Sequence, residues 1–105
     1  MKELAVRQML FREANENIAR VAGRLAGSGY QVFICECSNT GCTEALELTS
    51  EEYEAVRAHG ARFLVAPGHE QDEVERVVVG NGRYLVVENI GEAADVALAD
   101  DPRHA

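Results

Sequence analysis

The chain lacks several features that define common functional classes. It has no tryptophan, two prolines and one lysine among ten basic side chains, and aromatic residues make up only 6% of it. The aromatic and basic side chains that together bind nucleic acids are therefore missing. No apolar run approaches the roughly 20 residues that span a bilayer, and residues 1–4 do not begin the apolar segment of a secretory signal. We expect a cytoplasmic protein that binds neither nucleic acid nor membrane.

Charge is unevenly distributed along the sequence. The net charge is -8; residues 1–34 carry five basic and three acidic side chains, whereas residues 35–105 carry five basic and fifteen acidic ones. The second part, at -10, repels phosphate backbones, which again argues against nucleic-acid binding. Two interpretations stay open. The acidic surface only keeps the protein soluble, or the basic N-terminal segment docks onto the acidic body of its own chain or of a second copy.

Length and composition predict one folded domain, residues 1–105. Apolar residues make up 47% of the chain and charged residues 27%, with no internal repeat and no linker. A core of this size is marginal, so a bound metal ion would add useful stability.

The three cysteines of the chain lie within eight positions, at Cys35, Cys37 and Cys42, and His69 follows 27 residues later, directly after Pro67-Gly68. Three thiolates and one imidazole form a complete ligand set for a tetrahedral metal ion, most often zinc. An odd number of clustered cysteines also fits a metal site better than a disulfide framework. The sequence therefore predicts a metal site, with three buried free cysteines as the alternative.

His69 is the preferred fourth ligand because a turn can direct its side chain toward the thiols. His59 is expected at the end of a helix, and His104 lies in a terminal segment that tends to fray. Glu36 and Glu70 flank the predicted ligands. Each is either a hydrogen-bond partner of a ligand or an exposed carboxylate, and we expect the latter.

Coordination by His69 would decide the class of the site. Four protein ligands close a zinc site, and closed sites are structural, whereas catalytic zinc keeps a position for water. Without His69, three thiolates and a water would form an open site beside a histidine general base. The sequence has no nucleophile elbow and no phosphate-binding fingerprint. We interpret the protein as a non-catalytic interaction or regulatory module, with a small metalloenzyme as the alternative.

The order of the four candidate ligands, two cysteines one residue apart, a third cysteine and then a histidine, resembles that of the CDGSH iron–sulfur proteins. This resemblance implies a 2Fe-2S cluster and a redox function as an alternative to Zn2+. In that family the histidine follows the last cysteine within a few residues. Here His69 lies farther along the chain, and no Cys-Asp-Gly-Ser sequence is present.

The cysteines fall on a predicted β-hairpin. In a strand over residues 30–37, alternation directs Phe33, Cys35 and Cys37 to one face. Turn-forming residues at 38–41 then reverse the chain. A second strand, residues 42–48, would return Cys42 to the other two thiols.

The N-terminal segment, residues 3–26, is predicted to be a long amphipathic helix that ends at the glycines that follow it. Apolar side chains recur every seven residues and are expected to cover a sheet: Leu4, Phe11, Ile18 and Leu25. A second apolar flank, Val6, Met9 and Leu10, lacks an obvious partner within the chain. Self-association through residues 3–26, or binding of another protein, is the interaction that we expect.

Turn and cap signals complete the expected fold. Thr49 and Glu52 form a capping-box pattern, and Asn81-Gly82 indicates a tight hairpin. The class is α+β, a long N-terminal helix on a small, mostly antiparallel sheet, in the order α-β-β-α-β-β-β-α. The remaining elements are a helix from Thr49 to about residue 59, strands at 61–65, 74–79 and 83–89, and a helix at 91–99.

Several segments share a wider pattern: Cys35-x-Cys37-x4-Cys42, Pro67-Gly68-His69-Glu70, and residues 11–16, 52–57, 63–66, 74–78 and 84–88. With them the chain resembles a group of short actinobacterial proteins for which no function is established. The resemblance covers nearly the whole chain. It implies a stand-alone cytoplasmic domain of bacterial origin and carries no activity with it.

Overall fold

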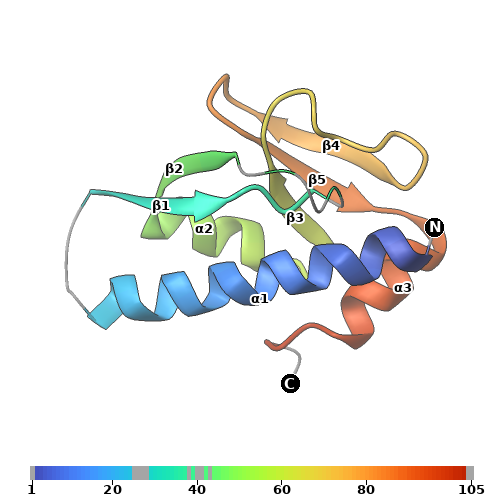
Figure 1. Ribbon diagram of the computed structural model, residues 1–105, viewed down its shortest axis with the longest axis horizontal. Coiled ribbons are helices and arrows are strands. Elements are labelled where there is room, and N and C mark those ends of the chain that lie inside the picture. The colour runs from blue at the N-terminus through green and yellow to red at the C-terminus, as the bar shows by residue number, and fades with distance from the viewer. Residues whose placement is uncertain (1, 25–28, 38, 40–41, 43, 104–105) are drawn as a thin grey trace.

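Three helices and five strands make up the computed structural model, which describes residues 2–24, 29–37, 39, 42 and 44–103 (Figure 1). The predicted α+β class and the predicted order of the elements are confirmed. The elements are α1 (Lys2–Arg24), β1 (Tyr30–Ile34), β2 (Ala45–Thr49), α2 (Ser50–Arg57), β3 (Arg62–Val65), β4 (Glu75–Gly80), β5 (Leu85–Asn89) and α3 (Gly91–Ala99).

The strands form two sheets, and every strand pair is antiparallel. β1 and β2 form a hairpin, and β3, β5 and β4 form a second sheet with β5 in the middle. The chain leaves the first hairpin after Ile34 and runs past β3, where the backbone N–H of Glu36 donates to the carbonyl of Leu64 at 2.6 Å. The segment of residues 35–37 therefore joins the two sheets.

Local signals fix the ends of α2 and the β4–β5 hairpin. Thr49 caps α2: the Glu52 N–H donates to Thr49 Oγ1 at 3.1 Å, and the Thr49 N–H donates to the Glu52 carboxylate at 2.9 Å. The predicted capping box is confirmed. Between β4 and β5, Gly82 adopts a left-handed φ of 85°, which glycine reaches at little cost. The Asn81 side-chain oxygen accepts hydrogen bonds from the backbone N–H groups of Arg83 and Tyr84, the two residues after Gly82.

The face that α1 turns to the body is mostly polar, so the predicted apolar face is only partly right: Met9, Ile18 and Ala19 pack against the hydrophobic core. Gln8, Arg12 and Asn15 are almost completely buried, while Phe11 and Ile18 are only half-buried. The side chain of Leu4 and all of Leu25 lie outside the described residues. The reason is that the body offers hydrogen-bonding groups along α1, so the polar side chains can be buried without losing partners.

Arg12 shows how this interface is satisfied. Its guanidinium donates to the Gly60 carbonyl at 2.7 Å and to the Ala97 carbonyl at 3.0 Å, and it lies 4.9 Å from the centre of the Phe63 ring. Burial, and then the nearby positive charge of Arg57, lower the pKa of Arg12. The carbonyl of Ala97 belongs to the last turn of α3, where helix carbonyls favour a positive charge. One side chain thus ties α1 to two separate segments.

Asn15 takes the place of a neighbouring strand at the free edge of β1. Its amide nitrogen donates to the Ile34 carbonyl at 2.8 Å, and the Ile34 N–H donates to its amide oxygen at 2.9 Å. The same amide nitrogen also donates to Glu36 at 2.8 Å. The helix therefore satisfies the edge of the sheet as well as covering it. No described helix is both long enough and apolar enough to cross a membrane.

We predict that Asn15→Ala lowers the free energy of unfolding by about 2–4 kcal/mol, because it removes the partners of two partly buried backbone groups of Ile34 and one donor to the buried Glu36 carboxylate. Asn17→Ala is the matched control, since Asn17 lies on the exposed side of the same helix; it should change stability by no more than about 0.5 kcal/mol. Urea unfolding followed by circular dichroism measures both. Equal effects of the two variants would contradict the assigned role of Asn15.

Candidate metal centre

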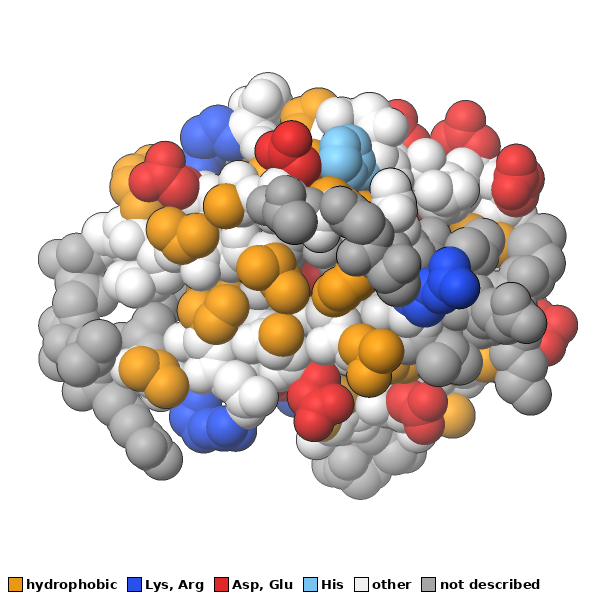
Figure 2. Space-filling view, viewed as in Figure 1, with side chains coloured by type: hydrophobic (Ala, Val, Ile, Leu, Met, Phe, Trp, Pro, Cys, Tyr) orange, Lys and Arg blue, Asp and Glu red, His pale blue; other side chains and the backbone are white. Residues whose placement is uncertain are grey.

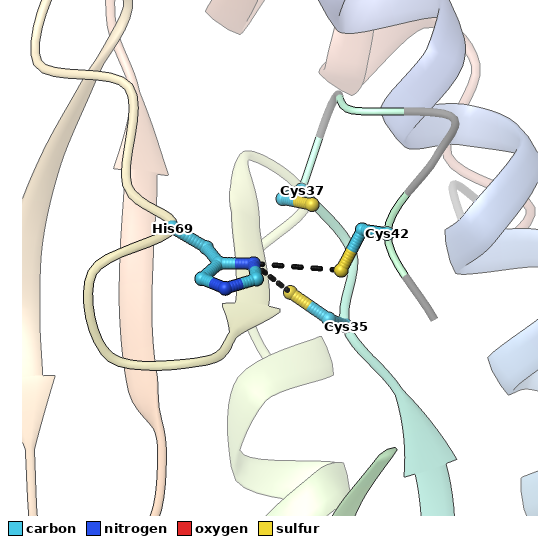
Figure 3. A group of neighbouring side chains, drawn as sticks. All are labelled: Cys35, Cys37, Cys42 and His69. Atoms are coloured by element: carbon cyan, nitrogen blue, oxygen red, sulfur yellow. Dashed lines mark hydrogen bonds between the residues drawn. The ribbon is translucent and has the colours of Figure 1, made fainter. Parts of the chain in front are cut away.

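The four predicted ligands come from two connections that are far apart in sequence. Cys35 and Cys37 follow β1, Cys42 precedes β2, and His69 lies in the connection between β3 and β4 (Figure 3). Beyond the paired strands the first hairpin continues through the Cys35 N–H, which donates to the Glu44 carbonyl at 3.1 Å. Cys42 is thereby returned to the side of the other two thiols, as predicted.

A tight turn brings His69 to the thiols. The His69 N–H donates to the Ala66 carbonyl at 3.0 Å, and Gly68 has a left-handed φ of 89°. Because Ala66 directly follows β3, this turn begins at the end of a buried strand. The Pro67-Gly68 signal therefore predicted both the turn and the direction of the histidine.

The ligand atoms converge. One atom from each of Cys35, Cys37, Cys42 and His69 lies within 4.8 Å of all the others. His69 Nδ1 is 3.4 Å from Cys42 Sγ and 3.6 Å from Cys35 Sγ. A tetrahedron with Zn–S bonds near 2.3 Å and Zn–N bonds near 2.0 Å has S···N edges of about 3.6 Å. These four side chains could therefore hold a metal ion.

Of the two histidines in the described residues, His69 is the one that lies beside the three thiols. Figure 3 shows Nδ1 as the ring nitrogen nearest the thiols, with the second ring nitrogen pointing away from them. His59 lies exposed after the end of α2 and outside this cluster. His104 is outside the described residues.

Two opposing effects act on the pKa values of the buried thiols. Burial raises the pKa of Cys35, and it also raises the pKa of Cys37. Acting against burial, the backbone N–H of Ala66 donates to Cys35 Sγ at 3.2 Å and lowers the pKa of that thiol. An N–H aimed at sulfur stabilises a thiolate, while burial without a cation favours the neutral thiol. A metal cation at the centre of the cluster would favour the thiolates, which are the form that binds metals.

Glu36, between the two buried cysteines, is fully buried, and the expectation of an exposed carboxylate was wrong. Its carboxylate accepts hydrogen bonds from the Asn15 amide at 2.8 Å, the Leu64 N–H at 2.8 Å and the Tyr53 hydroxyl at 3.2 Å. Burial raises the pKa of Glu36, and these donors act in the opposite direction. The carboxylate fixes the chain between Cys35 and Cys37 to α1, α2 and β3, which holds the two thiols in place.

Glu70, next to His69, is half-buried rather than exposed. Its Oε1 atom is buried and has no hydrogen-bond partner among the described residues. A buried carboxylate oxygen without a donor is costly. Glu70 directly follows His69, the predicted ligand that lies in the connection between β3 and β4.

We predict that His69→Ala lowers the affinity for Zn2+ or Co2+ by more than about 100-fold. Loss of an outer hydrogen-bond partner of a ligand already costs 10–100-fold, and loss of a ligand should cost more. His59→Ala is the control and should leave the affinity unchanged. Competition with a chromophoric chelator gives both values. Equal affinities in the two variants would remove His69 from the ligand set.

Comparisons with known proteins found no match from which a function could be transferred, so the function is argued from the chemistry of these side chains. No protein-family model matches the chain. No curated protein and no solved structure matches it either.

Proposed function

We propose that the protein is a zinc-binding module in which Cys35, Cys37, Cys42 and His69 hold one Zn2+ in a closed, structural site, and that it acts through contacts with other proteins rather than by catalysis. The observation that carries the proposal is the convergence of the four ligand atoms within 4.8 Å. The three cysteines and His69 lie on connections of two different sheets. Their proximity therefore does not follow simply from being neighbours in one short segment.

The distances favour one metal ion over a 2Fe-2S cluster. The S···N separations of 3.4 and 3.6 Å match the edges of a single tetrahedron. A two-iron cluster divides its ligands between two metal ions, so ligand atoms on different irons lie farther apart. Zn2+ also suits a set of thiolates and one imidazole.

A closed site fits the position of the cluster in the fold. The three thiols belong to the β1–β2 sheet, and His69 belongs to the β3–β5–β4 sheet. A metal ion bound to all four would cross-link the sheets at the point where residues 35–37 pass β3. Four protein ligands leave no position for a substrate or a catalytic water. The expected contribution is therefore stability and a fixed relative placement of the sheets.

The metal content tests the proposal directly. Protein purified without chelator or affinity metal should contain one zinc per chain by elemental analysis and native mass spectrometry, and it should be colourless. Visible absorption with bound iron and sulfide would instead support the iron–sulfur alternative. Absence of any metal after expression in zinc-supplemented medium would overturn the proposed function.

Removal of the metal should weaken the whole fold. We predict that Cys37→Ser lowers the melting temperature by at least about 10 °C, since a loss of 2 kcal/mol shifts a domain of this size by roughly that amount. Structural zinc contributes on the order of 10 kcal/mol in small finger peptides, and less where a core already exists. A chelator should reproduce the shift in the wild type and have no further effect on the variant. A wild-type melting curve that does not change when the metal is removed would contradict a structural role.

The outer side of α1 supports the assignment as an interaction module. Figure 2 shows hydrophobic side chains gathered over α1 and β1 on one face of the molecule. Leu10, Val21 and Val32 are 61%, 53% and 57% exposed. Leu10 and Val21 lie eleven residues apart, about three turns of α1, and therefore on the same exposed side of the helix. Of the predicted second flank, Leu10 is exposed, whereas Met9 is half-buried and packs against the core, as Ile18 does.

This geometry supports self-association through residues 3–26, with the α1 helices of two copies packed along the exposed side that carries Leu10 and Val21. We predict that the double variant Leu10→Lys, Val21→Lys stays folded but shifts the protein to the monomer. Leu98→Lys is the control, because Leu98 is also exposed, at 48%, and lies on α3. Sedimentation equilibrium over a wide concentration range measures the effect. A wild-type protein that is strictly monomeric at the highest concentration would exclude this mode.

A further inference from the structure

We propose that the metal centre is also a thiol-oxidation site, at which a peroxide converts Cys37 and Cys42 into a disulfide and the metal ion is released. The inference rests on the proposed zinc site and adds a means of regulating it. The geometry that points to it is the close packing of three sulfur atoms with unequal access to solvent. All three lie within 4.8 Å of one another.

The three cysteines differ in their exposure to solvent. Cys42 is half-buried, whereas Cys35 and Cys37 are only 3% and 1% exposed. A small oxidant such as hydrogen peroxide would therefore reach Cys42 first. Zinc-bound thiolates remain nucleophilic, and oxidation follows thiolate character and exposure.

The chemistry needs one peroxide and two thiolates. The Cys42 thiolate attacks one peroxide oxygen, so that an S–O bond forms, the O–O bond breaks and hydroxide leaves. The Cys37 thiolate then attacks the sulfur of this sulfenic acid, so that an S–S bond forms, the S–O bond breaks and a second hydroxide leaves. With two protons the products are one disulfide and two waters. The two sulfurs together lose two electrons, and the two peroxide oxygens gain them.

Cys37 is the expected partner of Cys42 because Cys35 is held in place. The Ala66 N–H donates to Cys35 Sγ at 3.2 Å. His69 Nδ1 lies 3.6 Å from Cys35 Sγ and 3.4 Å from Cys42 Sγ, so this contact does not distinguish the two thiols. Formation of an S–S bond of about 2.05 Å requires two sulfurs to approach by less than about 3 Å, which side-chain rotation can supply. The hairpin connection already places Cys37 and Cys42 on facing arms.

Disulfide formation removes two of the four ligands. Cys35 and His69 alone cannot close a tetrahedral site, so the metal ion would dissociate. The cross-link between the two sheets is then lost, while the new disulfide closes only the short connection between β1 and β2. Oxidation would therefore release zinc and separate the turn that carries His69 from the thiols.

Zinc-loaded protein treated with hydrogen peroxide tests this sequence of events. We expect one zinc to be released per chain, measured with a chromophoric chelator, together with a mass loss of 2 Da and a Cys37–Cys42 cross-link in peptide mapping. A thiol reductant with added zinc should restore the loaded state. Retention of zinc under excess peroxide, or conversion of the thiols to sulfinic acid without a disulfide, would overturn the inference.

A matched pair of variants identifies the disulfide without depending on bound zinc. Cys35→Ser keeps the proposed pair and should still lose 2 Da, whereas Cys42→Ser should form no intramolecular disulfide. Circular dichroism confirms that each variant is folded. A disulfide between Cys35 and Cys37 in the Cys42→Ser variant would contradict the assigned pair. A wild-type protein that never binds zinc but forms the Cys37–Cys42 disulfide would refute the proposed function and leave the thiol chemistry standing.

Discussion

The buried carboxylate of Glu36 is the interaction on which the arrangement of the other elements depends. A charged group without solvent is very costly unless it is hydrogen-bonded. Here it receives donors from Asn15 of α1, Tyr53 of α2 and Leu64 of β3. Each donor comes from a different element, so none of these elements can move without leaving the carboxylate less satisfied.

The same segment carries the candidate metal site. Residues 35–37 present two thiols to the cluster and the Glu36 carboxylate to the rest of the interior, and the Glu36 backbone pairs with Leu64. The placement of two of the four ligand atoms is therefore set by a polar network that includes no ligand. Such support holds a ligand geometry before a metal ion is present, which reduces the ordering that binding must impose.

The interface of α1 with the body shows the same reliance on polar contacts. Gln8, Arg12 and Asn15 each bond to a different part of the chain, and a shift of the helix by one residue would break all three sets of bonds. Apolar contacts tolerate small shifts, whereas buried polar groups require one register. This interface leaves the apolar side chains of Leu10 and Val21 exposed on α1.

The sequence by itself determined the elements and the four candidate ligands. Thr49 and Glu52 fixed the start of α2, Asn81-Gly82 fixed the hairpin of β4 and β5, and the spacing of three cysteines with a turn-borne His69 predicted their convergence. Caps, turns and alternation act over a few residues, so they can be read locally. Only the tertiary structure decided that α1 buries Arg12 and Asn15, that Glu36 lies in the interior, and that the strands form two sheets. A buried polar group needs partners from distant segments, and hydrophobic periodicity contains no information about where those partners are.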